Sequence, residues 1–165
     1  METYLLKKVS IFSALDEAQL EYIARYCVTR HYNKDQLILV EEEAGKTLFI
    51  ISKGRVKVTR TNDDGREVIL SILESGDFFG EMSILDGRAR SANVTASDNS
   101  ELVLIRRGDF LQLLEEVPQI AISLLKELAR RLRKSDTQIK SLSLQDALGR
   151  VASTLVLLAD EIGLA

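Results

Sequence analysis

The sequence has one cysteine, one histidine and one proline among its 165 residues. A single cysteine, Cys27, excludes a disulfide framework and a zinc site built from the thiolates of one chain. A single histidine, His31, excludes sites that need two histidine ligands, which removes most zinc hydrolases and metal-dependent jelly-roll enzymes. We therefore expect no metal, and because no nucleophile–base pair is visible we do not expect an enzyme.

A long hydrophobic run and an excess of positive charge are also missing. No stretch of 18 apolar residues is present, so we expect no membrane-spanning helix. Lys7 and Lys8 are not followed by the apolar segment of a signal peptide, which indicates a reducing, cytoplasmic setting. The net charge of −3 is unlike that of a nucleic-acid-binding surface, so the chain does not look like a DNA-binding unit.

The sequence that is present divides into three zones, of which the first is short and helical. Apolar residues recur at helical spacing between residues 13 and 27. Asp16 followed by Gln19 resembles a capping box, which predicts a helix start. Cys27 is expected to close the apolar face of this helix and His31 to begin a strand, and both are interpreted as structural residues.

The second zone, from about residue 28 to residue 107, has the pattern of β-structure. Asn62 to Gly65 is a hairpin signal. Glycines nine to eleven residues apart suit turns that need positive φ, namely Gly45, Gly54, Gly65 and Gly76. The predicted strands are residues 48–51, 55–60, 67–73, 92–96 and 102–105. The fold class is therefore α+β, mainly β, with a sandwich, barrel or jelly roll at its centre.

The third zone is helical. One helix is expected from Gly108 to Glu116, and Pro118 suits the first turn of the next helix, where a missing N–H costs nothing. A last amphipathic helix is expected over residues 145–162. The middle helix carries a heptad seam with spacings of four and three residues, formed by Ala121, Leu125, Leu128, Leu132, Ser135, Ile139 and Leu142.

The seam admits two interpretations. A narrow a/d stripe is typical of a helix that pairs with another helix, which predicts a parallel dimer, but the helix could instead lie on its own β-domain. Ser135 interrupts the seam and is expected to fix the register or to contact a polar group. The neighbouring basic cluster is expected to be a solvated helix face, with Arg131 reaching a ligand as the alternative, and it comprises Arg130, Arg131, Arg133 and Lys134.

Residues 78–94, called the cassette below, carry the chemistry. Gly80 allows a close backbone approach, Glu81 is an acceptor for a sugar hydroxyl, and Arg90 offers a fork for a phosphate. Residues 82–85 are expected to form one helical turn. Ser91 and the amide of Ala92 add neutral donors, so the set suits a small anionic nucleotide. A P-loop and a Gly-x-Gly-x-x-Gly motif are both missing. On residue types alone, an ordinary surface ion pair of Glu81 with Arg90 remains the alternative.

The cassette resembles the phosphate-binding segment of cyclic nucleotide-binding domains. Residues 128–132 and 146–152 are similar to the Crp/Fnr family of bacterial transcription regulators, near the catabolite activator branch. The resemblance implies a β-roll of jelly-roll type with a short N-terminal helix and a long C-terminal dimerisation helix. It divides the chain into a β-roll domain (1–116), a dimerisation helix (117–144) and the start of a C-terminal region (145–165).

The same resemblance implies roles for individual residues. Gly80 and Glu81 would sit on the ribose, while Arg90, Ser91 and Ala92 would bind the cyclic phosphate. Met82 is a further predicted contact to the nucleotide. Ser135 matches a position that reaches the purine in cAMP-binding relatives. Asp136 departs from the family, which has serine there, and so leaves cGMP open beside cAMP. Val58 and Leu70 would flank the base or sugar, and Arg131 is a further predicted contact to the ligand.

The family implies a sensor and homodimer whose nucleotide controls DNA binding allosterically. The DNA contacts would belong to a helix-turn-helix domain that this sequence does not contain. Iron–sulfur oxygen sensors need about four cysteines, and a haem sensor needs axial ligands that a lone histidine does not supply. Two other functions stay open, namely a dimer scaffold without bound nucleotide and a regulatory module of a kinase or channel.

Overall fold

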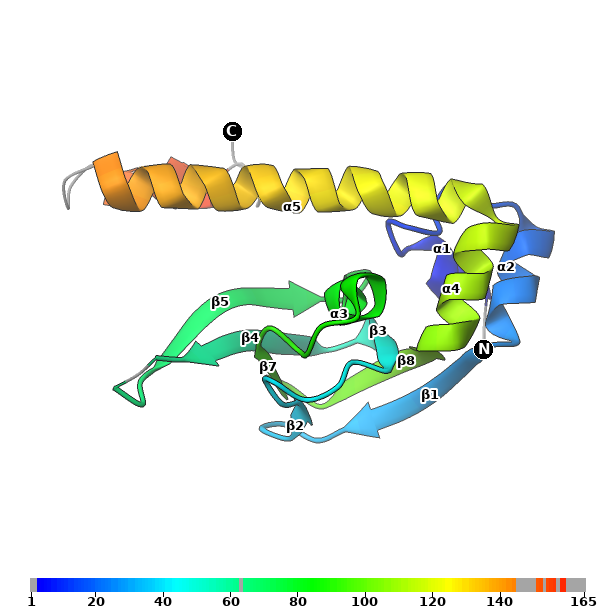
Figure 1. Ribbon diagram of the computed structural model, residues 1–165, viewed down its shortest axis with the longest axis horizontal. Coiled ribbons are helices and arrows are strands. Elements are labelled where there is room, and N and C mark those ends of the chain that lie inside the picture. Colours follow the sequence, from blue (N-terminus) through cyan, green and yellow to red (C-terminus); the bar gives the residue numbers. More distant parts are fainter. Residues whose placement is uncertain (1–2, 63, 145–150, 153, 157, 160–165) are drawn as a thin grey trace. The chain divides into compact units, whose positions relative to one another are not determined.

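The computed structural model describes residues 3–62, 64–144, 151–152, 154–156 and 158–159 (Figure 1). The chain forms two compact units, Met1–Leu124 and Leu125–Ala165, which are described separately. Of the helices in the described part of the chain, none combines the length and hydropathy needed to cross a bilayer.

Two short helices precede the strands. The first, α1, is Thr3–Lys7, and the second, α2, is Glu17–Ala24. The predicted capping box is confirmed, because the amide of Gln19 donates to Asp16 Oδ1 at 2.8 Å and the amide of Asp16 donates to Gln19 Oε1 at 3.1 Å.

The predictions for Cys27 and His31 were wrong in their local structure. Because α2 ends at Ala24, Cys27 lies beyond the helix and opens the first strand, β1 (Cys27–Tyr32). Its thiol donates to the carbonyl of Ile23 at 3.4 Å. His31 is the fifth residue of β1 and pairs with Glu101 of the neighbouring strand.

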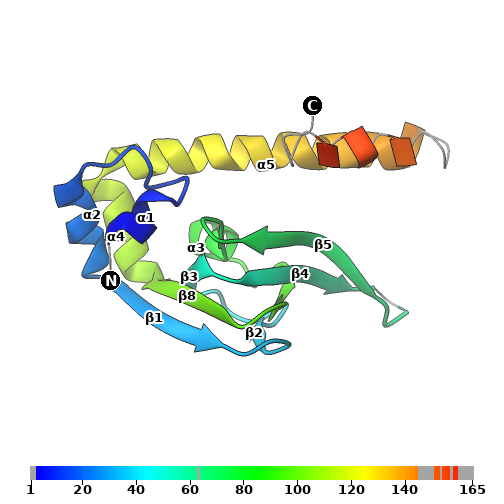
Figure 2. The same cartoon turned by 180° about the vertical axis from the view of Figure 1, so that it is seen from behind.

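Eight strands form two four-stranded antiparallel sheets, which confirms the β-roll. The strand orders are β1-β8-β3-β6 and β2-β7-β4-β5 (Figures 1 and 2). The five strands predicted by residue range are present, and β2 and β6 are additional. The strand expected to begin at His31 is β1, which begins four residues earlier, at Cys27. The remaining bounds are β2 Leu37–Leu39, β3 Thr47–Lys53, β4 Arg55–Thr61, β5 Glu67–Glu74, β6 Phe78–Phe79, β7 Asn93–Ala96 and β8 Ser100–Arg106.

The core of the roll is filled by side chains from both sheets. Phe49 of β3 and Phe79 of β6 stack with ring centroids 5.1 Å apart and planes 4° from parallel. Ile51, Val56 and Leu102 join the same buried cluster. Four consecutive residues of β3 are buried, so its sequence is a continuous apolar run and does not alternate between apolar and polar residues.

The turn glycines follow the prediction with one exception. Gly54, Gly65 and Gly76 have φ values of 90°, 78° and 96°. Gly45 has no positive φ, so the prediction of such a turn there was wrong. A side chain at Gly45 would instead collide with Ser83 and crowd the Arg90 guanidinium, so packing is the reason that glycine fits this position.

Two helices follow the roll as predicted. The first, α4, is Arg107–Glu116, and α5 is Pro118–Leu144 with its proline at the first position. Phe110 and Leu113 are fully buried in the first unit. Of the last predicted helix, residues 151–152, 154–156 and 158–159 are helical, and the others lie outside the described residues. The division into domains at 116 and 144 stays a prediction.

Candidate functional site

The cassette is built around a short helix, α3 (Glu81–Asp86), which directly follows β6. This confirms the expected helical turn. Gly80 caps the helix with a φ of 85°. A Cβ at Gly80 would lie 2.6 Å from Arg90 Nη1 and 3.0 Å from the carbonyl oxygen of Thr47, so only glycine fits there.

Arg90 is held from several sides. Only 6% of the residue is exposed. Its Nη1 donates to the carbonyl of Gly80 and its Nη2 to that of Thr47, each at 2.7 Å. The backbone is fixed as well, because the amide of Arg90 donates to Glu43 at 2.8 Å and its carbonyl accepts from Glu42 at 2.9 Å. The guanidinium therefore has a defined position before any ligand arrives.

The charge of Arg90 is balanced by its neighbour Glu81. Burial lowers the pKa of Arg90, and the carboxylate of Glu81 acts in the opposite direction. Glu81 is itself only 4% exposed. The two residues are thus not an ordinary surface ion pair, since both charges are largely removed from water.

Of the remaining predicted phosphate contacts, one is exposed and one is buried. Ser91 is exposed and its hydroxyl lies 3.9 Å from the sulfur of Met82, which is also exposed. Ala92 is buried. The cassette therefore combines a buried cation with exposed groups through which a ligand can approach.

The predicted contacts on the strands differ from one another. Val58 is half-buried and packs against the core cluster. Leu70 is exposed and lies at a β-bulge, because Val58 pairs with Ser71 whereas Thr59 pairs with Ile69. Contact of either side chain with a ligand stays a prediction.

Arg131, Ser135 and Asp136 belong to the second unit, so their contacts to a ligand also stay predictions. The Ser135 hydroxyl donates to the backbone carbonyl of Arg131 at 3.1 Å, and Asp136 is exposed. The Asp136 side chain is therefore accessible on the second unit, whereas the Ser135 hydroxyl is hydrogen-bonded to the backbone of its own helix.

Sequence reasoning missed Glu127, which organises the basic cluster. Its carboxylate accepts from Arg130 at 2.7 and 2.9 Å and from Arg131 Nε at 2.9 Å. The hydrogen bond from Arg130 is the main cause of the lowered pKa of Glu127, with Arg131 adding to it and burial opposing it. The spacing of three and four residues was the available signal. Arg130, Arg133 and Lys134 are nevertheless exposed and Arg131 is half-buried, so the cluster is largely solvated, with Glu127 pairing two of its four cations.

The heptad seam is largely uncovered within the described chain. Leu125, Leu132 and Ile139 are 67%, 63% and 63% exposed. Ala121 and Leu128 are half-buried, and the side chain of Leu142 lies outside the described residues. The described residues include no group of three His, Cys, Asp or Glu side chains placed to hold a metal ion.

Comparison with known proteins agrees with the fold. The family model described as cyclic nucleotide-binding domain matches residues 29–117. The cyclic AMP receptor protein of Thermus thermophilus is 35% identical over 151 residues, covering 92% of this chain and 70% of that protein. The chain therefore belongs to the cyclic nucleotide-binding domain family, within its group of CRP-like regulators.

Solved structures show the same relationship. The Thermus thermophilus catabolite activator protein superposes with a TM-score of 0.75 at 34% identity, over 81% of this chain and 63% of that one. The regulatory subunit of a cAMP-independent protein kinase A from Trypanosoma brucei has a TM-score of 0.70 at 26% identity, over 83% of this chain and 49% of that one. The chain thus spans about two thirds or less of these structures.

Proposed function

We propose that the chain binds a cyclic nucleotide, with cAMP as the preferred ligand, and relays its presence to DNA binding in a CRP-type regulator. The observation that carries the proposal is the Arg90 guanidinium, buried against Gly80 and beside Glu81. A buried, pre-positioned guanidinium suits an anionic group that arrives with its own hydrogen-bond acceptors.

Arg90 has donors left for a phosphate. A guanidinium carries five N–H groups, and two hydrogen bonds go to backbone carbonyls. The Ser91 hydroxyl and the Ala92 amide would supply neutral donors to the same phosphate. Glu81 would accept from a ribose hydroxyl, with Gly80 and Met82 beside the sugar.

The base would be read by α5 together with the roll. Ser135 and Arg131 of the second unit are the proposed purine contacts, and Val58 and Leu70 would flank the base or sugar. Asp136 is the position that decides selectivity, because a carboxylate accepts from the N–H edge of guanine but only from the amino group of adenine. We propose cAMP first and keep cGMP open on account of this aspartate.

The proposed output is a change in a dimer. The seam through Leu125, Leu132 and Ile139 exposes large apolar side chains at seven-residue intervals, as in a helix that pairs with a copy of itself. Nucleotide binding would favour one arrangement of the paired helices and so reorient a DNA-binding domain that follows. The chain would act in the cytoplasm as a sensor and not as an enzyme.

Substitution of the cassette tests this proposal. Arg90→Ala should abolish the thermal stabilisation that cAMP gives. Because Arg90 also donates hydrogen bonds to two backbone carbonyls, its removal can lower the stability of the fold itself. The second variant is therefore Ser91→Ala, at an exposed position. It should weaken cAMP binding and leave the melting temperature of the unliganded protein unchanged. Arg66→Ala, an exposed arginine on the β4–β5 hairpin, is the matched control. Equal cAMP affinity in all four proteins would exclude the cassette as the site.

A second function is favoured by one comparison. A kinase regulatory subunit described as cAMP-independent has the same fold at 26% identity. The domain could accordingly be a regulatory module or a scaffold that does not bind cAMP. A monomer in solution would support the module, whereas a dimer that binds no cyclic nucleotide would support the scaffold.

A further inference from the structure

A depression borders the cassette and shares Ser83 and residues 87–89 with it, but its lining does not include Glu81, Arg90 or Ser91. It has a volume of about 370 Å³ and is completed by the segment before β3 and the first residue of α4. The argument below uses its charged lining residues Glu42, Lys46, Arg88 and Arg107 and its glycines Gly45 and Gly87.

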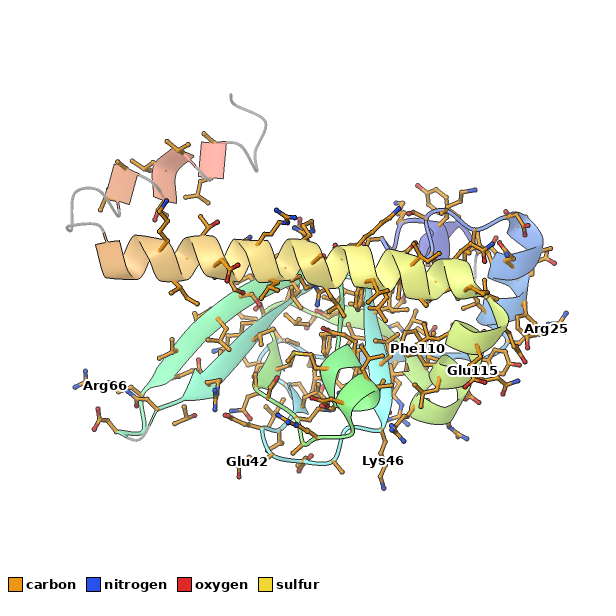
Figure 3. All side chains as sticks on the ribbon, turned by 45° about the horizontal axis from the view of Figure 1, so that its top comes forward. Arg25, Glu42, Lys46, Arg66, Phe110 and Glu115 are labelled. Atoms are coloured by element: carbon orange, nitrogen blue, oxygen red, sulfur yellow. The ribbon has the colours of Figure 1, made fainter. Side chains whose placement is uncertain are left out.

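The lining carries three cations and one carboxylate in a chain whose net charge is −3. Lys46 and Arg88 are exposed, and their side chains have no hydrogen-bond or ion-pair partner among the described residues. Arg107 donates from Nε to the carbonyl of Ile84 at 3.2 Å, which anchors the guanidinium and leaves its terminal N–H groups to other acceptors. The side chains of Glu42 and Lys46 project from the same loop (Figure 3).

Two of the residues that line the depression are glycines, Gly45 and Gly87. A Cβ added at Gly87 would meet nothing within 4 Å, and Gly87 has a φ of 71° that favours glycine. At Gly45 a side chain is excluded by Ser83. The volume falls in the range of small-molecule sites, roughly 300–1,000 Å³.

We propose that this depression is a second anion site, distinct from the predicted phosphate contacts Arg90, Ser91 and Ala92, that binds the phosphoryl group of a small metabolite. A phosphoryl dianion offers three acceptor oxygens, which match one anchored and one exposed guanidinium together with a lysine ammonium. The carboxylate of Glu42 repels negative charge, so a ligand should bind with its phosphoryl group facing the three cations and away from Glu42.

The test is an amide NMR titration of the full chain with inorganic phosphate and with pyrophosphate, which compares one phosphoryl group with two. We expect saturable shifts at the amides of residues 44–46 and 87–89. Lys46→Ala and Arg88→Ala should each weaken binding by roughly three- to fivefold, as exposed charge pairs do. Arg66→Ala, which removes a cation from the distant hairpin, should leave binding unchanged (Figure 3).

Three results would overturn the proposal. Shifts confined to Ser91 and Ala92 would place the anion at the predicted cyclic-phosphate contacts instead. The lack of any saturable shift would show that the depression does not bind phosphate. An equal loss in Arg66→Ala would indicate diffuse attraction by surface charge. None of these outcomes depends on whether the cassette binds a cyclic nucleotide.

Discussion

Arg90 shows how a single residue of the cassette depends on contacts that are distant in the sequence. Its guanidinium needs the carbonyl of Gly80, which is close in sequence, and that of Thr47, which is 43 residues away. Motif reasoning found Gly80, Glu81 and Arg90 because they lie within one short segment. It missed Thr47 and the packing role of Gly45, since nothing in the local pattern shows which backbone will meet the arginine.

Glu42 holds a backbone conformation that disfavours its side chain, with a φ of 69°. Because glycine adopts this region freely, Glu42→Gly should raise the free energy of unfolding by about 0.5–1 kcal/mol. Urea denaturation measures the change. The adjacent Glu43→Gly is the matched control, because Glu43 has no positive φ and should lose roughly 0.4–1 kcal/mol. A loss in both variants would contradict the argument from strain.

Cys27 should be unreactive in the folded protein. Burial raises the pKa of its thiol to about 12, so thiolate is scarce at neutral pH. Reaction with a chromogenic disulfide reagent at pH 8 should be about a thousandfold slower than in denaturant, and its rate should rise about tenfold per pH unit. Cys27→Ser gives the background rate. A native rate within tenfold of the denatured rate would contradict this prediction.

Among the elements, those with long periodic patterns were predictable from the sequence. The five predicted strands alternate or form apolar runs of four residues or more, and α5 carries a sustained heptad pattern. The strands that were missed, or misplaced at their start, have weaker signals. The missed β2 and β6 have three and two residues, and β1, whose start was misplaced, is exposed at four of its six positions. Such strands are fixed by pairing with partners, namely β7, β3 and β8, rather than by their own pattern.

The exposed seam of α5 leads to a prediction about assembly. Leu132→Glu would place a charge at the centre of the proposed dimer interface, so the full chain should become monomeric in sedimentation equilibrium. Lys126→Glu introduces the same side chain on the same helix but off the seam, and it should remain dimeric. A wild-type chain that is monomeric, or a Leu132→Glu variant that dimerises as wild type does, would contradict the proposed interface.

For the molecule as a whole, the strand and glycine pattern predicted the class of fold, the cassette predicted the domain, and residues 128–132 and 146–152 narrowed the family. The cassette motif lies within residues 78–94, whereas the proposed purine contact Ser135 lies on the second unit. Linking the two requires the arrangement of the units and of the proposed dimer, which no local pattern encodes. Ligand choice is therefore the least predictable property, and Asp136 is where it is expected to be decided.

Calorimetric titration of the chain with cAMP, cGMP and cyclic di-GMP, paired with thermal melts, tests the central claim most directly. We predict that cAMP binds most tightly and, at 100-fold above its Kd, stabilises the folded chain by about 2.7 kcal/mol. Tighter binding of cGMP would move Asp136 into the site and revise the ligand. Binding of none of the three, with the fold intact, would contradict the proposed sensor and leave a dimerisation scaffold.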